Sequence, residues 1–486
     1  MKPPTRRFSL SSLALSLSLL FTIPPPSQAV SNSDSSVPER LSSTFSELRE
    51  QGFAGFVVVA KDGEIIFADG AGLANAETNR PFTLDTQIDT LSITKTFTGM
   101  VAAQLITLGD LSPSDTLKDF FPDIPSDKAD ISLHQLLTHT SGFVSVLGSD
   151  TNEDDQETFL SQAFSSALLF EPGSDYAYSN VGYSIVAVLI EKVTETSFED
   201  HLIDAYLSPA ALTHTGYMRA YDDRLAAHDV RMRSLIDASW GGHSPNWHLM
   251  GNGGLVSTPR EMISWLASYS RGEIVSPEAV ALAHQPHVLE GEGASSHYGY
   301  GLVVEDHPEY GQIFWHNGGS RHFNSHWREH ADHGYTLFVT TNAHTVSADM
   351  ASLAMEAALF ENDFEIRPRI RRLSDPVALP DTAFGVFAQE FLDTVAQESP
   401  LIWQNFIDTR LSENMLSHAS RDQYLETFQT LHNDFGVATL IGWKSKENKV
   451  ILVVQRPDSG ESMRIILDLD DLLSPNYLTS FDVRSG

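Results

Sequence analysis

The chain has 486 residues, a formal net charge of −33 and no cysteine. This length allows two or three domains, each able to bury a core. The lack of cysteine excludes disulfides, thiolate nucleophiles and cysteine-ligated metals, and the negative charge disfavours nucleic acid and anionic lipid surfaces as partners.

The first 29 residues have the pattern of a secretory signal. Basic residues among the first seven precede the apolar run FSLSSLALSLSLLFTI, and the small-x-small triplet Ser27-Gln28-Ala29 follows. The apolar run is short for a membrane anchor. We therefore expect cleavage after Ala29, a periplasmic or secreted protein, and no stable membrane span after cleavage.

Strand patterns lie on both sides of a long helical region. A hairpin is predicted over residues 53–72, where FAGFVVVA leads into the turn Lys61-Asp62-Gly63 and a return strand. Strand patterns resume at residues 298–304, 311–316 and 335–341. We expect an α/β fold of the mixed α+β kind, with one mainly antiparallel sheet, flanking helices and a helical insertion.

Ser92 and Lys95 lie one turn apart at the start of a predicted helix. Apolar residues recur at helical spacing from Ile93 to Leu108, and Gly109 ends the pattern. A serine at a helix N-terminus can act as a nucleophile if a neighbouring base takes its proton. A lysine can be that base only if burial or a nearby cation lowers its pKa. The alternative is an ordinary helix start with a solvated lysine.

Two later stretches carry polar groups that suit the same chemistry. In Tyr178-Ser179-Asn180 a tyrosine could relay protons and an asparagine could orient a lysine and a substrate amide; a helix cap with a core tyrosine is the alternative. Residues 315–319, WHNGG, end a predicted strand, where a backbone N–H can face an oxyanion; a plain glycine turn is the alternative.

Histidines at positions 322, 326, 330 and 333 would include a metal-binding face if the segment were helical. The segment lies between two strand patterns, and its alternation suits a sheet. We therefore expect a solvated edge and loop, and no metal or other cofactor.

The last part of the chain is predicted to be separate. Residues 365–382, EIRPRIRRLSDPVALPDT, combine prolines with a cluster of arginines and are predicted to be a linker. Residues 383–486 begin with helical patterning and end with strand patterns, which predicts a small α+β domain without a recognisable chemical motif.

Together the motifs resemble those of the serine β-lactamase and penicillin-binding-protein superfamily, which has S-x-x-K, S-D-N and K-T-G signatures. The matching stretches are SITKTFTG, ISLHQLLTHTSGF, YSNVGYSIVAVLIEKVTE, NGGLVSTPREM and YGYGL…HNGG, in the family's order. The resemblance is to the class C β-lactamases, the related D,D-peptidases and the β-lactamase-like esterases, which have Y-x-N as the second motif. It implies a β-lactamase/transpeptidase-like domain over residues 30–364.

The resemblance also implies catalytic roles. Ser92 would be the acylated nucleophile, Lys95 its proton acceptor, and Tyr178 the partner base that activates the deacylating water or alcohol. His139 recurs in the family as a structural histidine and is not expected to be catalytic.

Substrate binding is implied for the remaining motif residues. Asn180 would bind a substrate amide and Lys95, and the N–H groups of Ser92 and Gly319 would form the oxyanion hole. The substrate-binding strand would contribute His316, Asn317, Gly318 and Gly319. His316 and Asn317 replace the lysine and threonine of K-T-G, and this departure leaves the substrate open.

The expected function is a secreted serine hydrolase that acts on esters or amides through an acyl-enzyme on Ser92. Esterase, D,D-peptidase, D-amino-acid peptidase and β-lactamase activities all remain open, and the partner would be a small-molecule, peptide or peptidoglycan-derived substrate. The alternative is a catalytically silent relative that binds peptidoglycan or peptide. A third hypothesis places a scaffold role in the C-terminal domain. The oligomeric state is not predicted.

Overall fold

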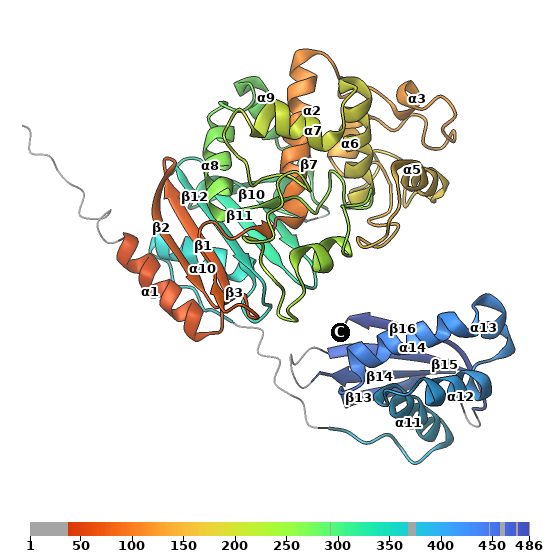
Figure 1. Cartoon of the computed structure of the whole chain (residues 1–486). Coiled ribbons are helices and arrows are strands. Elements are labelled where there is room, and N and C mark those ends of the chain that lie inside the picture. Colours follow the sequence, from red (N-terminus) through yellow and green to blue (C-terminus); the bar gives the residue numbers. More distant parts are fainter. Residues whose placement is uncertain are drawn as a thin grey trace, which may run out of the picture.

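The computed structural model describes residues 37–291, 293–367, 376–446, 448–456, 462–472 and 475–485 (Figure 1). The predicted signal and its cleavage site lie outside the described residues. Among the helices of the described ranges, none combines the length and the apolar character needed to cross a membrane.

An eight-stranded antiparallel sheet organises the first part of the chain, in the order β2-β1-β12-β11-β10-β9-β8-β7. Its strands are β1 (Gly55–Lys61), β2 (Glu64–Ala71), β7 (Val288–Leu289), β8 (Ser296–Tyr298), β9 (Val303–His307), β10 (Gly311–Gly319), β11 (Asn324–His330) and β12 (Tyr335–Thr341). Val58 of β1 lies opposite Phe338 of β12. Strands from both ends of this region therefore share one sheet, which confirms the predicted fold class.

Helices cover both faces of this sheet (Figure 1). On one face α1 (Val37–Glu50) and α10 (Ala348–Phe360) pack on Val57 and Val339. On the other face α2 (Thr94–Leu108) and α8 (Pro259–Ser270) pack on Val58 and Phe338. Neighbouring residues of each strand thus pack into the hydrophobic cores on opposite faces of the sheet, because successive side chains of a strand point to opposite faces.

The helical insertion lies between β2 and β7, as predicted. Besides α2 and α8 it contains α3 (Leu117–Phe120), α4 (Leu133–Leu137), α5 (Gln156–Ser165), α6 (Asn180–Thr194), α7 (Phe198–Leu202), η2 (Ile203–Leu207), η3 (Ile236–Trp240) and α9 (Pro277–Ala283). The 3-10 turn η1 (Leu91–Ile93) leads into α2, and the short strands β3 (Leu73–Asn75), β4 (Arg80–Pro81), β5 (Ile88–Asp89) and β6 (Val256–Ser257) form two small sheets. Phe97 of α2 stacks on Trp265 of α8 at 3.8 Å between ring centroids, so both helices are fixed against one another above the sheet.

The prediction of a solvated edge for the histidine-rich segment is wrong in its central part. β11 is an interior strand between β10 and β12, and the side chains of His326 and His330 are 3% and 0% exposed. Arg328 lies between them and pairs with Glu356 of α10 at 3.2 Å. That ion pair opposes the cost of burying the Arg328 charge, whereas His326 Nδ1 and His330 Nδ1 are buried without a hydrogen-bond partner among the described residues. Among the described residues, no group of three or more His, Asp or Glu is placed to hold a metal ion.

Residues 376–485 contain a hydrophobic cluster of their own. The elements are α11 (Ala383–Ala396), α12 (Pro400–Arg410), α13 (Glu413–His418) and α14 (Arg421–Phe435), then an antiparallel sheet of β13 (Thr439–Lys446), β14 (Lys449–Gln455), β15 (Ser462–Leu469) and β16 (Leu478–Ser485). Phe391 and Phe406 pack together at 5.8 Å between ring centroids. The order of elements agrees with the predicted α+β pattern. The linker prediction falls partly on residues 368–375, outside the described ranges, and the domain limits stay predictions.

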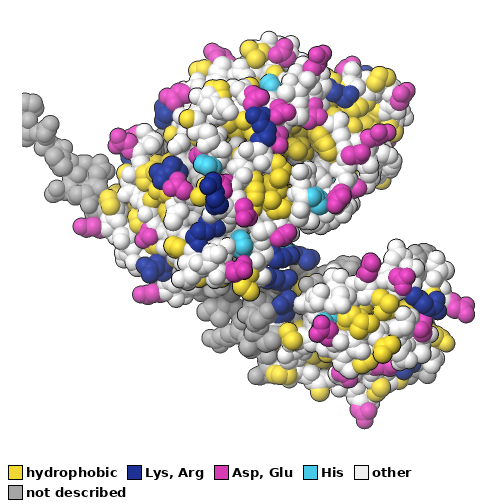
Figure 2. All heavy atoms as spheres, viewed as in Figure 1, with side chains coloured by type: hydrophobic (Ala, Val, Ile, Leu, Met, Phe, Trp, Pro, Cys, Tyr) yellow, Lys and Arg dark blue, Asp and Glu magenta, His cyan; other side chains and the backbone are white. Residues whose placement is uncertain are grey.

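Acidic side chains are spread over the visible surface rather than gathered in one patch (Figure 2). On the face shown, the acidic side chains therefore form no single patch that marks a binding surface for a large cationic partner.

Candidate active site

Ser92 lies in η1, the turn that leads directly into α2. The preceding residue, Leu91, has a φ of 55°, a left-handed conformation that costs energy for a non-glycine residue. The turn is stabilised by the Leu91 N–H, which donates to Asp89 Oδ1 at 2.7 Å, and by the Thr90 hydroxyl, which donates to the Leu255 carbonyl at 2.7 Å. Ser92 is thereby presented, half-buried, at the N-terminal end of α2, where backbone N–H groups favour a developing negative charge.

Lys95 is completely buried, one turn after Ser92. Its Nζ lies 3.4 Å from Ser92 Oγ and donates to the Asn252 carbonyl oxygen at 2.7 Å. Burial holds the pKa of Lys95 well below its usual 10.5, and the charge of Asp150 offsets part of that fall. Burial disfavours the ammonium form, so Lys95 has the protonation behaviour that a proton acceptor requires. The solvated-lysine alternative is not what the structure shows.

Asn252 is a positioning residue that the sequence analysis did not single out. Its side-chain amide donates to Ser184 Oγ at 2.8 Å and to the His248 carbonyl at 2.6 Å. These two hydrogen bonds hold the backbone carbonyl of Asn252 in place to accept from Lys95. The stretch NGGLVSTPREM, in which it lies, matched the family, but no side-chain chemistry in that stretch indicated a backbone contact to Lys95.

Tyr178 and Asn180 flank Ser179, the residue that caps α6. The Ser179 N–H donates to His139 Nδ1 at 3.0 Å, and the His139 ring packs on Tyr178 at 4.3 Å. His139 therefore positions the motif, which agrees with the structural role implied for it. Lys95 Nζ lies 4.7 Å from the centroid of the Tyr178 ring.

The Tyr178 hydroxyl and Asn180 Oδ1 are buried without a hydrogen-bond partner among the described residues. Burial raises the pKa of Tyr178 well above its usual value, and Ser92, which the hydroxyl faces without reaching hydrogen-bonding geometry, opposes part of the rise. Tyr178 thus retains its proton in the resting site. Buried polar atoms without partners are uncommon, so these two atoms are candidates to bind substrate or water.

His316 belongs to β10 and is 3% exposed. Its Nδ1 lies 2.6 Å from the Asn317 carbonyl oxygen, which can only accept, so Nδ1 carries the proton and Nε2 accepts from the Tyr298 hydroxyl at 3.0 Å. Burial lowers the pKa of His316 to about 3, with a smaller contribution from Lys95. His316 is therefore neutral, and both of its ring nitrogens already have partners.

Gly318 allows β10 to approach the Ser92 turn closely. A Cβ atom at this position would lie 2.6 Å from Leu91 Cβ and 3.0 Å from Ser92 N. Gly319 follows at the end of the strand, paired with Asn324 of β11. The two glycines therefore place the strand end, with its backbone N–H groups, beside the start of α2.

The side chain of Asn317 does not join this cluster. Its Nδ2 donates to Asp349 Oδ1 of α10 at 2.9 Å, and α10 packs on the other face of the sheet. Neighbouring residues of a strand face opposite ways, so Asn317 and His316 cannot both face Ser92. The structure brings together Ser92, Lys95, Tyr178, His316 and Gly318. Asn180 and Gly319 adjoin this cluster along the chain, two residues after Tyr178 and one residue after Gly318.

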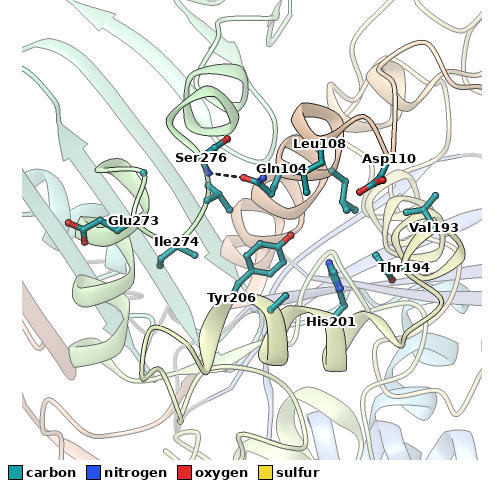
Figure 3. Close-up of a pocket in the computed structure, with 14 residues that line it drawn as sticks. Gln104, Leu108, Asp110, Val193, Thr194, His201, Tyr206, Glu273, Ile274 and Ser276 are labelled. Atoms are coloured by element: carbon teal, nitrogen blue, oxygen red, sulfur yellow. Dashed lines mark hydrogen bonds between the residues drawn. The ribbon is translucent and has the colours of Figure 1, made fainter.

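A separate hollow of about 610 Å³ lies at the far end of α2 (Figure 3). Its lining includes Gln104, Leu108, Asp110, Tyr206 and Glu273. At 1.5 Å of rise per residue, the helix places Leu108 about 24 Å from Ser92. This hollow is therefore not part of the Ser92 cluster.

Comparison with known proteins agrees with the geometry. The model of the Beta-lactamase family matches residues 41–361. The chain is 25% identical over 343 residues to Penicillin-binding protein 4* of Bacillus subtilis, covering 65% of this chain and 74% of that protein. It is 29% identical over 231 residues to esterase EstB of Burkholderia gladioli. This match covers 42% of this chain and 59% of that protein, so the chain spans somewhat over half of the esterase's length.

A solved structure shares the fold. The octameric penicillin-binding protein homologue from Pyrococcus abyssi aligns with a TM-score of 0.58 and 19% identity, covering 89% of this chain and 90% of that one. At this identity the likeness concerns the fold alone.

Proposed function

Because the chain belongs to the Beta-lactamase family of serine hydrolases, we propose that it cleaves ester or amide bonds through an acyl-enzyme on Ser92. The observation that carries the proposal is Lys95, fully buried and 3.4 Å from Ser92 Oγ. A serine becomes an effective nucleophile when an adjacent base of suitable pKa accepts its proton. The lowered pKa of Lys95 supplies such a base.

The proposed reaction has two stages. The neutral amine of Lys95 takes the Ser92 proton, Oγ attacks the substrate carbonyl, and the N–H groups of Ser92 and Gly319 stabilise the oxyanion. The proton then passes through the Tyr178 hydroxyl to the leaving group as the carbonyl–leaving-group bond breaks. In the second stage a water or alcohol gives its proton to the Tyr178–Lys95 pair and attacks the acyl carbon. The bond between that carbon and Ser92 Oγ then breaks, and Oγ takes the proton back from the pair, which releases the product and restores the Ser92 hydroxyl.

The surroundings of Ser92 favour neutral substrates over anionic ones. The position that holds a lysine in many relatives is His316, whose pKa of about 3 leaves it uncharged and whose nitrogens are both hydrogen-bonded. A carboxylate at this position would find neither a cation nor a free ring N–H. The proposal therefore leans toward esterase or amidase activity rather than β-lactamase activity.

A substrate panel tests the proposal. The wild type and Ser92→Ala would be compared on a neutral p-nitrophenyl ester, a D-Ala-D-Ala peptide and a β-lactam. We expect turnover of at least the neutral ester by the wild type, and none above background by Ser92→Ala. Binding of the peptide without turnover of any of the three would contradict the proposal and favour the catalytically silent relative.

We also propose that the protein is exported, on the pattern of residues 1–29. N-terminal sequencing of protein recovered outside the cytoplasm should begin at Val30. An uncleaved N-terminus on protein that remains inside the cell would contradict the proposal.

A further inference from the structure

We propose that the hollow at the far end of α2 is a second ligand site, which takes a small molecule with an ammonium group on an apolar body (Figure 3). This site lies apart from the Ser92 cluster and is independent of the acyl-enzyme function proposed above. Its walls come from the ends of α2 and α6, from α7 and η2, and from the loop before α9. The volume of about 610 Å³ suits a small molecule, since ligand pockets typically measure about 300–1,000 Å³.

Tyr206 supplies a polar group that has no partner in the protein. The residue is 7% exposed, and its ring lies beside the His201 ring at 5.5 Å between centroids. Its hydroxyl has no hydrogen bond with any residue in the described ranges, and it points into the hollow toward α2 (Figure 3). A tyrosine hydroxyl on a buried ring usually has a partner, so this one is left for a ligand.

His201 adds a second unpaired atom to the same wall. Its Nε2 is buried and has no hydrogen-bond partner among the described residues. Burial lowers the pKa of His201, so the ring is neutral at pH 7 and can accept from an N–H donor through one nitrogen. Opposite, the Gln104 side-chain carbonyl is fixed because it accepts from the Ser276 N–H at 2.7 Å (Figure 3).

The ends of two helices and one carboxylate make the hollow favourable for a cation. Leu108 and Thr194, the last residues of α2 and α6, both line it, and the C-terminal end of a helix carries partial negative charge on its carbonyl groups. Asp110 also lines the hollow, and its charge acts on Tyr206. Asp110 forms no ion pair with any residue that the structure describes.

The described residues that line the hollow include no lysine or arginine. Lys192, in the last turn of α6, lies instead over the Phe121 ring, with its Nζ 4.7 Å from the ring centroid. Glu273 lines the hollow too, but it is paired with Arg271 at 2.8 Å. Asp110 is therefore the acid whose charge is left for a ligand, and an anionic ligand would find no opposite charge.

The remaining walls are apolar, and they are formed by Leu105, Leu108, Val193, Ile274 and Val275. Leu108 is 63% exposed, so a ligand that covers it removes apolar surface from water. The ligand that fits these walls and the polar groups together has an alkyl or aryl body and one protonated amine.

The test compares three probes with the same apolar body: 4-phenylbutylamine, 4-phenylbutan-1-ol and 4-phenylbutyrate. Binding to the full chain would be measured by NMR titration at about pH 7, where an alkylamine is protonated. We expect the amine to bind with a Kd on the order of 0.1 mM and about tenfold more tightly than the alcohol. The carboxylate should bind more weakly than the alcohol.

Two conservative variants each remove one contact. Tyr206→Phe takes away only the hydroxyl and should weaken amine binding by about three- to fivefold. Asp110→Asn should weaken amine binding by about fivefold and alcohol binding by less than about twofold, because only the amine carries a charge. Thermal unfolding of both variants should match that of the wild type.

Two further variants separate the site from the overall charge. Asp123 is exposed and does not line the hollow, so Asp123→Asn makes the same change in net charge as Asp110→Asn. It should leave all three affinities within about twofold of the wild type. Ala205 lines the hollow and is exposed, so Ala205→Trp fills the hollow from its surface. It should weaken binding of both the amine and the alcohol by at least about tenfold.

The results that would overturn the proposal are distinct for each part of it. Unchanged amine binding in Ala205→Trp would place the amine elsewhere on the protein. Equal affinities for amine and alcohol in the wild type, or equal losses in Asp110→Asn and Asp123→Asn, would overturn the ammonium preference. Absence of binding by all three probes at about 100 times the expected Kd would overturn the site itself.

Discussion

Replacing Gly318 by alanine should move β10 away from the Ser92 turn. The added Cβ would lie 2.6 Å from Leu91 Cβ and from the Thr90 carbonyl oxygen, and 3.0 Å from Ser92 N. The Thr90 oxygen and Ser92 N are backbone atoms, which cannot swing aside as the end of a flexible side chain can. Relief to an ordinary contact of about 3.4 Å requires a relative movement of about 0.8 Å between β10 and η1.

Such a movement should reduce catalysis much more than folding. A misplacement of about 1 Å in a reacting constellation can cost about 10²-fold in rate, so kcat/KM on a neutral ester should fall by about 30- to 100-fold. An overpacked core position typically costs about 1–3 kcal/mol of stability, which most domains of this size tolerate. The assay pairs ester kinetics with thermal unfolding of the same variant.

Gly319→Ala is the matched comparison. A Cβ at position 319 would meet only Asn324 Nδ2, at 3.4 Å, an ordinary contact. The backbone N–H of residue 319 is retained, so the loss should stay below about threefold. Full activity in Gly318→Ala, or equal losses in both variants, would refute the reasoning that close approach of β10 to Ser92 organises the site.

Three further predictions concern the cluster and the chain as a whole. Lys95→Ala should slow acylation by about 10²–10⁴-fold in stopped-flow measurements, and a near-normal rate in this variant would indicate another base. In the wild type the acylation rate should rise with pH at values well below pH 10.5, because burial lowers the pKa of Lys95 and only its neutral form accepts a proton. His316→Lys should raise kcat/KM for a carboxylate-bearing ester, relative to a neutral ester, by about fivefold at pH 7. In the wild type the same ratio of kcat/KM values should not change from pH 5 to 8, because His316, with a pKa of about 3, does not change charge in that range. A strong wild-type preference for the carboxylate-bearing ester would contradict this prediction. Truncation near residue 365 should retain labelling of Ser92 by a fluorophosphonate probe, since the motif residues all precede it; a truncated protein that folds yet fails to label would show that the tail contributes to the site.

Structural features that depend on local sequence could be predicted. The β1–β2 hairpin has its turn at Asp62 and Gly63, with φ of 53° and 87°, because these residues tolerate left-handed backbone. The Ser92–Lys95 pair likewise follows from helical spacing alone. Both features involve residues that are close in the chain.

Features that depend on contacts between distant residues could not be predicted. The motif predicts that Asn317 binds substrate together with its neighbour His316, but the alternation of β10 directs the Asn317 side chain to Asp349, more than thirty residues later. The polar composition of the histidine-rich segment suggests that it is solvated, but His330 is buried because Glu356 of α10 lies over it.

The central claim is that Ser92 becomes covalently acylated, and mass spectrometry tests it most directly. The wild type and Ser92→Ala would each be mixed with a slowly hydrolysed p-nitrophenyl ester, quenched in acid, digested and sequenced by fragmentation. We expect one acyl group on the peptide that contains Ser92, fragment ions that place it on that residue, and no acyl group in Ser92→Ala. An adduct of equal yield in Ser92→Ala, or one localised to a different residue, would contradict it.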